Sequence, residues 1–178
     1  MKFKIFYILV CIVLVSCGSN KTINNEETFS SFKNTVNEKN IELEFEWAQS
    51  LGLGNVRGIN SLFPNGSNPN NISLIGNPNY FKVKKDSLYI DLPYYGTQQM
   101  ATTYSTRDNG ISFAGIPSEK NIEFISEKNK AVLKYEIKTA NDFCTMTLTL
   151  FPNNKGNLNV NSSRRTNISY NGNWRVVE

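Results

Sequence analysis

Apolar and polar residues alternate at every second position along most of this chain. In the clearest run, Ile41 to Ala48, one face carries Ile41, Leu43, Phe45 and Trp47, and the other carries Glu42, Glu44 and Glu46. That is the period of a half-buried β-strand. Alternate residues of a strand lie about 7 Å apart, so we interpret the glutamates as a solvent-exposed face and not as a metal or acid–base site.

Two later runs, Ala131 to Thr139 and Phe143 to Phe151, alternate in the same way. In the second run Cys144 shares its face with Met146 and Leu148. We therefore expect the Cys144 side chain to be buried, as a thiol among apolar neighbours usually is.

Shorter runs predict further strands, separated by turn residues such as Lys85-Asp86 and Asn109-Gly110. These predicted strands are Tyr80–Lys84, Ser87–Leu92, Ile111–Ile116, Asn121–Ser126, Leu158–Asn161, Ile168–Tyr170 and Trp174–Val177, with a weaker one at Asn55–Leu62 and an extended segment at Thr97–Ser105. The last two strands are expected to be joined by a turn at Asn171-Gly172. Short strands at this spacing indicate an all-β sandwich or barrel. No βαβ pattern is present, which excludes a Rossmann-type site.

One segment before the strands has the period of a helix. Glu26 and Glu27 suit its first turn, and Phe29, Phe32 and Val36 lie on one face. We predict a short N-terminal helix that begins near Asn25, with an extension of the preceding polar tether as the alternative.

The first residues have the pattern of an export signal. Lys2 and Lys4 precede an apolar run, Ile5 to Val15, that is shorter than the roughly 20 residues of a membrane-spanning helix. The segment then ends in Leu14-Val15-Ser16-Cys17, which is typical of a bacterial lipobox. We predict a signal peptide at residues 1–16, acylation of Cys17, a tether at 17–25 and a single β domain at 26–178. The alternative is an ordinary signal peptide with an incidental cysteine.

Composition excludes several classes of function. The chain has 19 basic and 15 acidic side chains, scattered along its length, so no nucleic-acid-binding surface is expected. Histidine is absent, which excludes Ser-His-Asp and Cys-His catalysis and any zinc or haem site that needs histidine. Cys11 leaves with the signal peptide and Cys17 is acylated, so Cys144 has no partner for a disulfide. We predict no cofactor, no metal and no enzymatic activity.

Several short motifs occur in the order of one known family. They are Phe45-Glu46-Trp47-Ala48, Asn79-Tyr80, Leu92-Pro93-Tyr94-Tyr95-Gly96, Asn109-Gly110-Ile111-Ser112-Phe113, Ser162-Ser163-Arg164-Arg165 and Ile168-Ser169-Tyr170-Asn171-Gly172. Over roughly residues 28–175 the chain resembles the Bacteroidetes exported lipoprotein family catalogued as domain of unknown function 4251. The resemblance implies a lipid-anchored antiparallel β meander that closes into a lipocalin-like barrel. It implies no activity and no ligand.

The resemblance also bears on location. Surface-exposed lipoproteins of that phylum usually carry acidic residues directly after the acylated cysteine, whereas Gly18-Ser19-Asn20-Lys21 has none. We therefore expect an outer-membrane protein that faces the periplasm. We also expect a monomer.

Two sets of residues are candidates for a site. Tyr94, Tyr95 and Arg107 flank two adjacent turns, and Arg164 and Arg165 lie on a late turn that could reach the same rim of a barrel. They would contact an anionic or sugar-like ligand, or alternatively form a tyrosine corner with arginines bonded to loop carbonyls.

Asp86-Ser87-Leu88 matches the tripeptide used for O-glycosylation in that phylum, and it also suits a hairpin turn. Ser87 is therefore a candidate modification site. For the protein as a whole, a non-catalytic binding module for a small or amphipathic ligand is the leading hypothesis. A structural or protein-interaction component of the envelope is the alternative.

Overall fold

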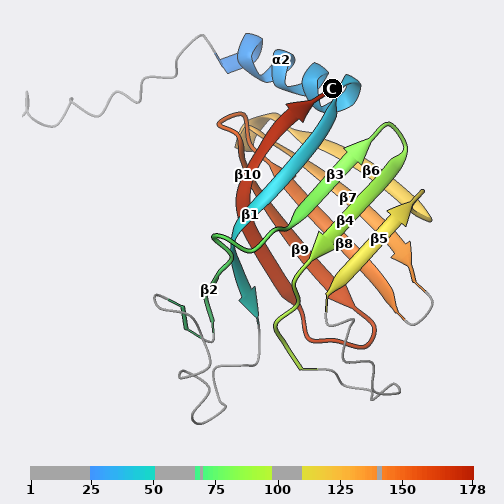
Figure 1. Cartoon of the computed structure of the whole chain (residues 1–178). Coiled ribbons are helices and arrows are strands. Elements are labelled where there is room, and N and C mark those ends of the chain that lie inside the picture. The colour runs from blue at the N-terminus through green and yellow to red at the C-terminus, as the bar shows by residue number, and fades with distance from the viewer. Residues whose placement is uncertain (1–24, 51–66, 69, 98–109, 140–141) are drawn as a thin grey trace, which may run out of the picture.

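A computed structural model describes residues 25–50, 67–68, 70–97, 110–139 and 142–178 (Figure 1). The predicted signal peptide, Cys17 and Arg107 lie outside the described residues. So do the strand predicted at Asn55–Leu62 and the extended segment predicted beyond Thr97.

The N-terminal helix is present as α2 (Asn25–Glu38). Glu26 and Glu27 lie in its first turn, where the helix dipole favours negative charge. Phe32 is buried, and its ring centroid lies 5.8 Å from that of Trp174. Figure 1 shows α2 across one end of the sheet, where β1 begins and β10 ends. The apolar face of the predicted helix therefore covers that end of the core.

Ten strands and a short 3-10 helix complete the described fold. They are β1 (Asn40–Ser50), β2 (Ile72–Ser73), β3 (Tyr80–Lys84), β4 (Ser87–Leu92), β5 (Ile111–Gly115), β6 (Glu119–Ile125), η3 (Ser126–Lys128), β7 (Lys130–Lys138), β8 (Phe143–Leu150), β9 (Lys155–Ser162) and β10 (Ile168–Val177). β2 was not predicted. The other strands correspond to those predicted from alternation, apart from differences of a few residues at their ends and the correction at β10 given below.

All ten strands belong to one antiparallel meander, in the order β5-β4-β3-β1-β10-β9-β8-β7-β6, with β2 paired to β1. The sheet curls into a half-barrel, consistent with the lipocalin-like barrel that was predicted (Figure 1). β5 and β6 are its two edges, although only three residues separate them in the chain. We call the line between β6 and the side of the sheet that carries the β3–β4 hairpin and β5 the seam; the described residues form no ladder across it, and Lys120 of β6 reaches the hairpin there.

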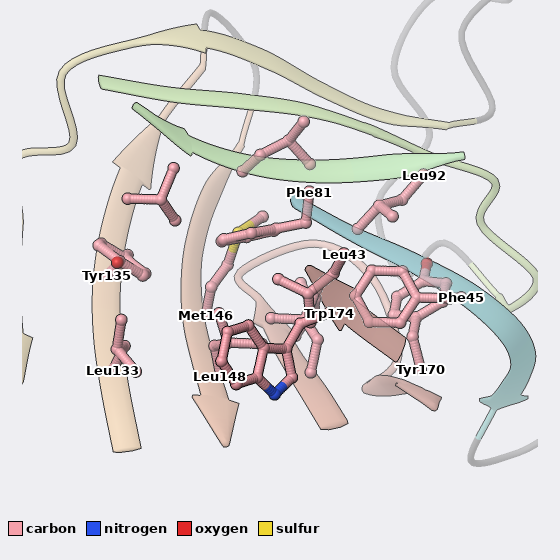
Figure 2. Packing of buried hydrophobic residues seen from close by; sticks show 14 of the residues in the cluster. Leu43, Phe45, Phe81, Leu92, Leu133, Tyr135, Met146, Leu148, Tyr170 and Trp174 are labelled. Carbon is pink, nitrogen blue, oxygen red and sulfur yellow. The ribbon is translucent and has the colours of Figure 1, made fainter. Parts of the chain in front are cut away.

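The interior of the half-barrel is filled by the protein's own side chains (Figure 2). Phe45 packs against Tyr170, with ring centroids 5.5 Å apart, and Phe81 packs against Tyr135 at 6.0 Å. Each fully buried side chain of this size contributes about 1.5–3 kcal/mol relative to exposure. The alternating residues of the sequence therefore supply a packed core and not a wide internal channel.

A β-bulge changes the alternation in β1. Phe45 pairs with Gly172 and Trp47 with Asn171, so Glu46 is the extra residue on the β1 side. Beyond the bulge the inward position passes to Ala48, which is buried, whereas Trp47 is only half-buried. The prediction that Trp47 shares the core face of Phe45 is therefore wrong, because one inserted residue reverses the facing of those that follow.

The turn predicted at Asn171-Gly172 is also wrong, because β10 continues unbroken from Ile168 to Val177. Gly172 lies opposite the bulge, where a Cβ atom would overlap the Glu44 carbonyl oxygen and the Phe45 Cα. Glycine is needed at this position for the close approach of two strands.

The glutamates of β1 point away from the core, as expected. Glu42 lies 3.1 Å from the Lys82 ammonium and 3.3 Å from the Arg175 guanidinium, and Glu44 is exposed. Glu42, Lys82 and Arg175 therefore form ion pairs on the outer face of the sheet.

Candidate functional site

Polar side chains gather at the end of the half-barrel away from α2, which we call the loop end (residues 93–97, 110, 142 and 162–166). The Tyr94 hydroxyl lies 2.9 Å from the Thr166 carbonyl oxygen, to which it donates a hydrogen bond. The Arg165 guanidinium lies 5.1 Å from the centroid of the Tyr94 ring, in cation–π geometry. Burial raises the pKa of Tyr94, so its hydroxyl stays protonated at neutral pH.

Arg165 also joins this end to two other loops. Its Nη1 donates to the Gly110 carbonyl oxygen at 2.8 Å, and its Nε lies 3.7 Å from Asp142 Oδ2. Asp142 in turn accepts hydrogen bonds from the Ser162 and Ser163 hydroxyls at 2.7 and 3.0 Å. Charge-assisted hydrogen bonds of this kind hold the late turn against the start of β8.

The predicted rim residues therefore do not all lie together. Tyr94 and Arg165 meet at the loop end, and Arg164 joins them through its backbone N–H, which donates to Ser162 Oγ. Tyr95 lies apart, accepting a 3.3 Å hydrogen bond from the Asn77 side chain. Arg107 lies outside the described residues. The partners found at this rim belong to the protein itself, and contact with a ligand stays a prediction.

The Tyr170 hydroxyl and the Cys144 thiol lie near the loop end, and their surroundings indicate a role in stabilising the fold. The buried Tyr170 hydroxyl donates to the Pro93 carbonyl oxygen at 2.8 Å, which ties β10 to the proline that follows β4. Cys144 is a free, buried thiol, as predicted. Burial, together with the nearby Asp142 carboxylate, raises the pKa of Cys144 to about 12, which makes it a poor nucleophile.

Ser87 is the first residue of β4, where it is half-buried and pairs with Lys84. It lies directly after the β3–β4 turn, beside the well-exposed Asp86. O-glycosylation of Ser87 stays a prediction.

A cavity lies at the α2 end of the half-barrel, on the seam. Its volume is about 260 Å³, and it lies between the end of α2, the β3–β4 hairpin, β6 and β7. Val36, Val83, Ile122 and Leu133 supply its apolar wall. This cavity therefore opens at the place where the sheet is not closed by hydrogen bonds.

Tyr135 is the unusual residue of this cavity. Its side chain is only 1% exposed, yet its hydroxyl has no hydrogen-bond partner among the described residues. Burial raises the pKa of Tyr135, so the hydroxyl remains a neutral donor and acceptor. A buried hydroxyl without a partner costs about 1–3 kcal/mol. Such a group commonly indicates a bound water or ligand.

Lys120 faces the same cavity from the edge strand β6. It lies directly opposite Tyr135 in the β6–β7 ladder, and opposite residues of a ladder project from the same face. Its ammonium crosses the seam and lies 3.3 Å from the Lys85 carbonyl oxygen and 3.6 Å from Asp86 Oδ1. Lys120 and Tyr135 therefore occupy opposite positions of the β6–β7 ladder in the cavity wall, and the exposed Lys120 side chain has its ammonium at the β3–β4 hairpin.

Sequence reasoning missed Tyr135 and Lys120. The alternation from Ala131 to Ile137 does place Tyr135 inward, and an inward tyrosine needs a partner for its hydroxyl. The lack of a partner depends on the position of the seam, which no local pattern reveals.

Within the described ranges, no helix is long and apolar enough to cross a membrane. The same residues contain no cluster of three or more cysteine, aspartate or glutamate side chains suited to a metal ion.

Comparison with known proteins places the chain in a family. Residues 24–174 match the family described as Domain of unknown function (DUF4251). The chain belongs to the DUF4251 family. A crystal structure of a DUF4251 family protein from Bacteroides eggerthii is similar in fold, with a TM-score of 0.54 and 12% sequence identity, over 84% of this chain and 88% of that one. No curated protein matches this DUF4251 chain.

Proposed function

We propose that this DUF4251 protein is a lipid-anchored envelope protein that binds a small amphipathic molecule in the seam cavity. The observation that carries the proposal is the Tyr135 hydroxyl, which is buried, unpartnered among the described residues, and part of the cavity wall. Ligand pockets typically begin at about 300 Å³, so a volume near 260 Å³ suits a small ligand.

The location within the cell rests on the N-terminal sequence. The short apolar run and Leu14-Val15-Ser16-Cys17 favour acylation at Cys17. The neutral and basic residues Gly18 to Lys21 favour the periplasmic face of the outer membrane. Mass spectrometry should find a mature chain that begins with a diacylated Cys17. Protease treatment of intact cells should leave the protein whole, and its removal would overturn the periplasmic assignment.

Native mass spectrometry of protein purified from its own envelope tests the binding role. We expect a retained mass beyond that of the acylated chain, lost after extraction with organic solvent. Ile122→Trp, which would fill the cavity, should abolish the retained mass. Ile116→Trp is the matched control, because Ile116 is exposed and is not part of the cavity wall. A retained mass that persists in Ile122→Trp would place the ligand elsewhere.

A second role, as a protein-interaction component of the envelope, is favoured by one observation. β5 is a five-residue edge strand whose outer side pairs with no other strand among the described residues, and such an edge can pair with a strand of another protein. In this case cross-linking in cells should join a partner to β5, and the native mass should show no small ligand.

A further inference from the structure

We infer that the seam cavity takes a small apolar carboxylic acid as its anion, held by the Tyr135 hydroxyl and the Lys120 ammonium. The inference rests on the proposed function and names the class of ligand. Four features carry it: the apolar wall, the two polar groups, the charge at the mouth and the volume.

The apolar wall comes from three parts of the chain. Val36 is in the last turns of α2, Val83 is in β3, and Ile122 and Leu133 face each other across β6 and β7. These side chains would contact the hydrocarbon part of a ligand, and each buried methylene contributes about 0.8 kcal/mol.

The two polar groups both suit an anionic oxygen. The Tyr135 hydroxyl can donate one hydrogen bond, and the Lys120 ammonium, which projects from the same face, adds a charge-assisted contact. A carboxylate accepts from both groups at once. An alcohol would bond to Tyr135 without compensating the ammonium, and an alkylammonium would be repelled by Lys120.

The charged residues at the mouth of the cavity favour an anionic ligand. Three lysines, Lys39, Lys85 and Lys120, are among the lining residues, against two acidic residues, Glu38 and Asp86. The Asp86 side chain is 85% exposed, so its attraction for Lys120 is weakened by water. The carbonyl end of α2 carries partial negative charge. It would therefore direct the carboxylate toward β6 and the hairpin, away from the helix.

The volume limits the size of the ligand. A cavity of about 260 Å³ equals the liquid volume of about nine water molecules, so it suits a ligand of about ten non-hydrogen atoms. Octanoate has this size, and octanol and octylammonium have the same tail with a neutral or a cationic head. The three compounds therefore separate head-group recognition from burial of the tail.

Isothermal titration calorimetry with these three compounds tests the inference. The protein would be purified from its own envelope into lipid nanodiscs, with empty nanodiscs as the reference for partitioning into lipid. We expect octanoate to bind about tenfold more tightly than octanol, as a charge-assisted bond to a partly buried group allows. We expect octylammonium to bind most weakly, and the preference for octanoate to fall as salt is raised.

Single substitutions test which residues cause the preference for octanoate over octanol. Lys120→Gln removes the charge but keeps a long side chain, so it should bring octanoate to the affinity of octanol and leave octanol unchanged. Tyr135→Phe should weaken octanoate and octanol alike. Lys155→Gln is the matched control, because Lys155 is in β9 and is not part of the cavity wall, and it should change neither affinity.

The outcomes separate the inference from the proposed function. Equal affinity for octanoate and octanol, or tightest binding of octylammonium, would overturn the anion and leave a binding role intact. An unchanged octanoate affinity in Lys120→Gln would leave Lys120 as an inward charge that protects an edge strand from pairing, and would also overturn the inference. If none of the three compounds binds and no mass is retained in native spectrometry, the inference and the proposed function both fail.

Discussion

Two buried tyrosines at opposite ends of the half-barrel differ in the hydrogen bonding of their hydroxyl groups. Tyr170 at the loop end and Tyr135 at the seam are each at most 1% exposed, and both project into the packed interior (Figure 2). The Tyr170 hydroxyl donates to the Pro93 carbonyl oxygen, whereas the Tyr135 hydroxyl has no partner among the described residues. The Tyr170 hydroxyl therefore stabilises the fold through a hydrogen bond, whereas the Tyr135 hydroxyl is the group that we propose binds a ligand.

The reason for the difference lies in the backbone around each tyrosine. At the loop end, loops fold back over the strands and bring carbonyl groups to Tyr94, Arg165 and Tyr170. At the seam, the described residues form no ladder between the two edges of the sheet, and none of them supplies a partner for the Tyr135 hydroxyl.

The largest expected effect comes from removing a charge at the loop end. Asp142→Ala removes the carboxylate that accepts from the Ser162 and Ser163 hydroxyls and pairs with Arg165, so it should lower the free energy of unfolding by about 3 kcal/mol. Asp86→Ala at the seam is the matched substitution, and it should cost less than about 0.5 kcal/mol, because Asp86 is well exposed. Urea denaturation of both variants measures the contrast, and similar losses would show that the two ends do not differ in this way.

The second prediction compares the tyrosines themselves. Tyr170→Phe should destabilise the protein by about 1–2 kcal/mol, because the Pro93 carbonyl oxygen loses its donor. Tyr135→Phe should be neutral or stabilising by up to about 1 kcal/mol in ligand-free protein, since it removes a hydroxyl that has no partner. Thermal unfolding after extraction of any ligand checks both values. A loss in Tyr135→Phe equal to that in Tyr170→Phe would reveal a hydrogen bond at Tyr135.

The third prediction concerns the pH dependence of stability that follows from burial of the Cys144 thiol near the loop end. The folded-state pKa of Cys144 is about 12, above its ordinary value of 9.0, so the unfolded chain loses the thiol proton first as pH rises. Stability should therefore be fully present below about pH 8 and fall by about 1 kcal/mol between about pH 8 and pH 10. Cys144→Ala should reduce this fall. A fall of the same size in the variant would show that Cys144 is not its source.

The smallest expected effect concerns Lys120. Its contacts with the Lys85 carbonyl oxygen and Asp86 are long and partly exposed, so Lys120→Gln should change the free energy of unfolding by less than about 0.5 kcal/mol. Chemical denaturation without ligand checks this value. A loss above about 2 kcal/mol would make Lys120 a structural closure of the seam instead of a ligand-binding group.

Most of the fold followed from alternation, because a strand with one buried face repeats every two residues. The helix, the buried face of β8 and the end of β4 at Pro93 were all predicted from local patterns. The bulge at Glu46 and the close approach at Gly172 were not, since both depend on which strand lies next to which.

The site was harder to predict for the same reason. Tyr94 and Arg165 were grouped correctly, because the turns that carry them lie at one end of a meander. Tyr135 and Lys120 are fifteen positions apart on paired strands, and their significance depends on an edge that has no sequence signature. Predicting a site at the seam therefore requires the order of the strands in the sheet as well as the alternation of apolar and polar residues.

A crystal structure of the protein with octanoate tests the central claim most directly. The account predicts electron density for the tail in the seam cavity, with a carboxylate oxygen about 2.5–2.7 Å from the Tyr135 hydroxyl oxygen and within ion-pair distance of Lys120. Octanoate bound at the loop end beside Tyr94 and Arg165, with the seam cavity empty, would contradict it.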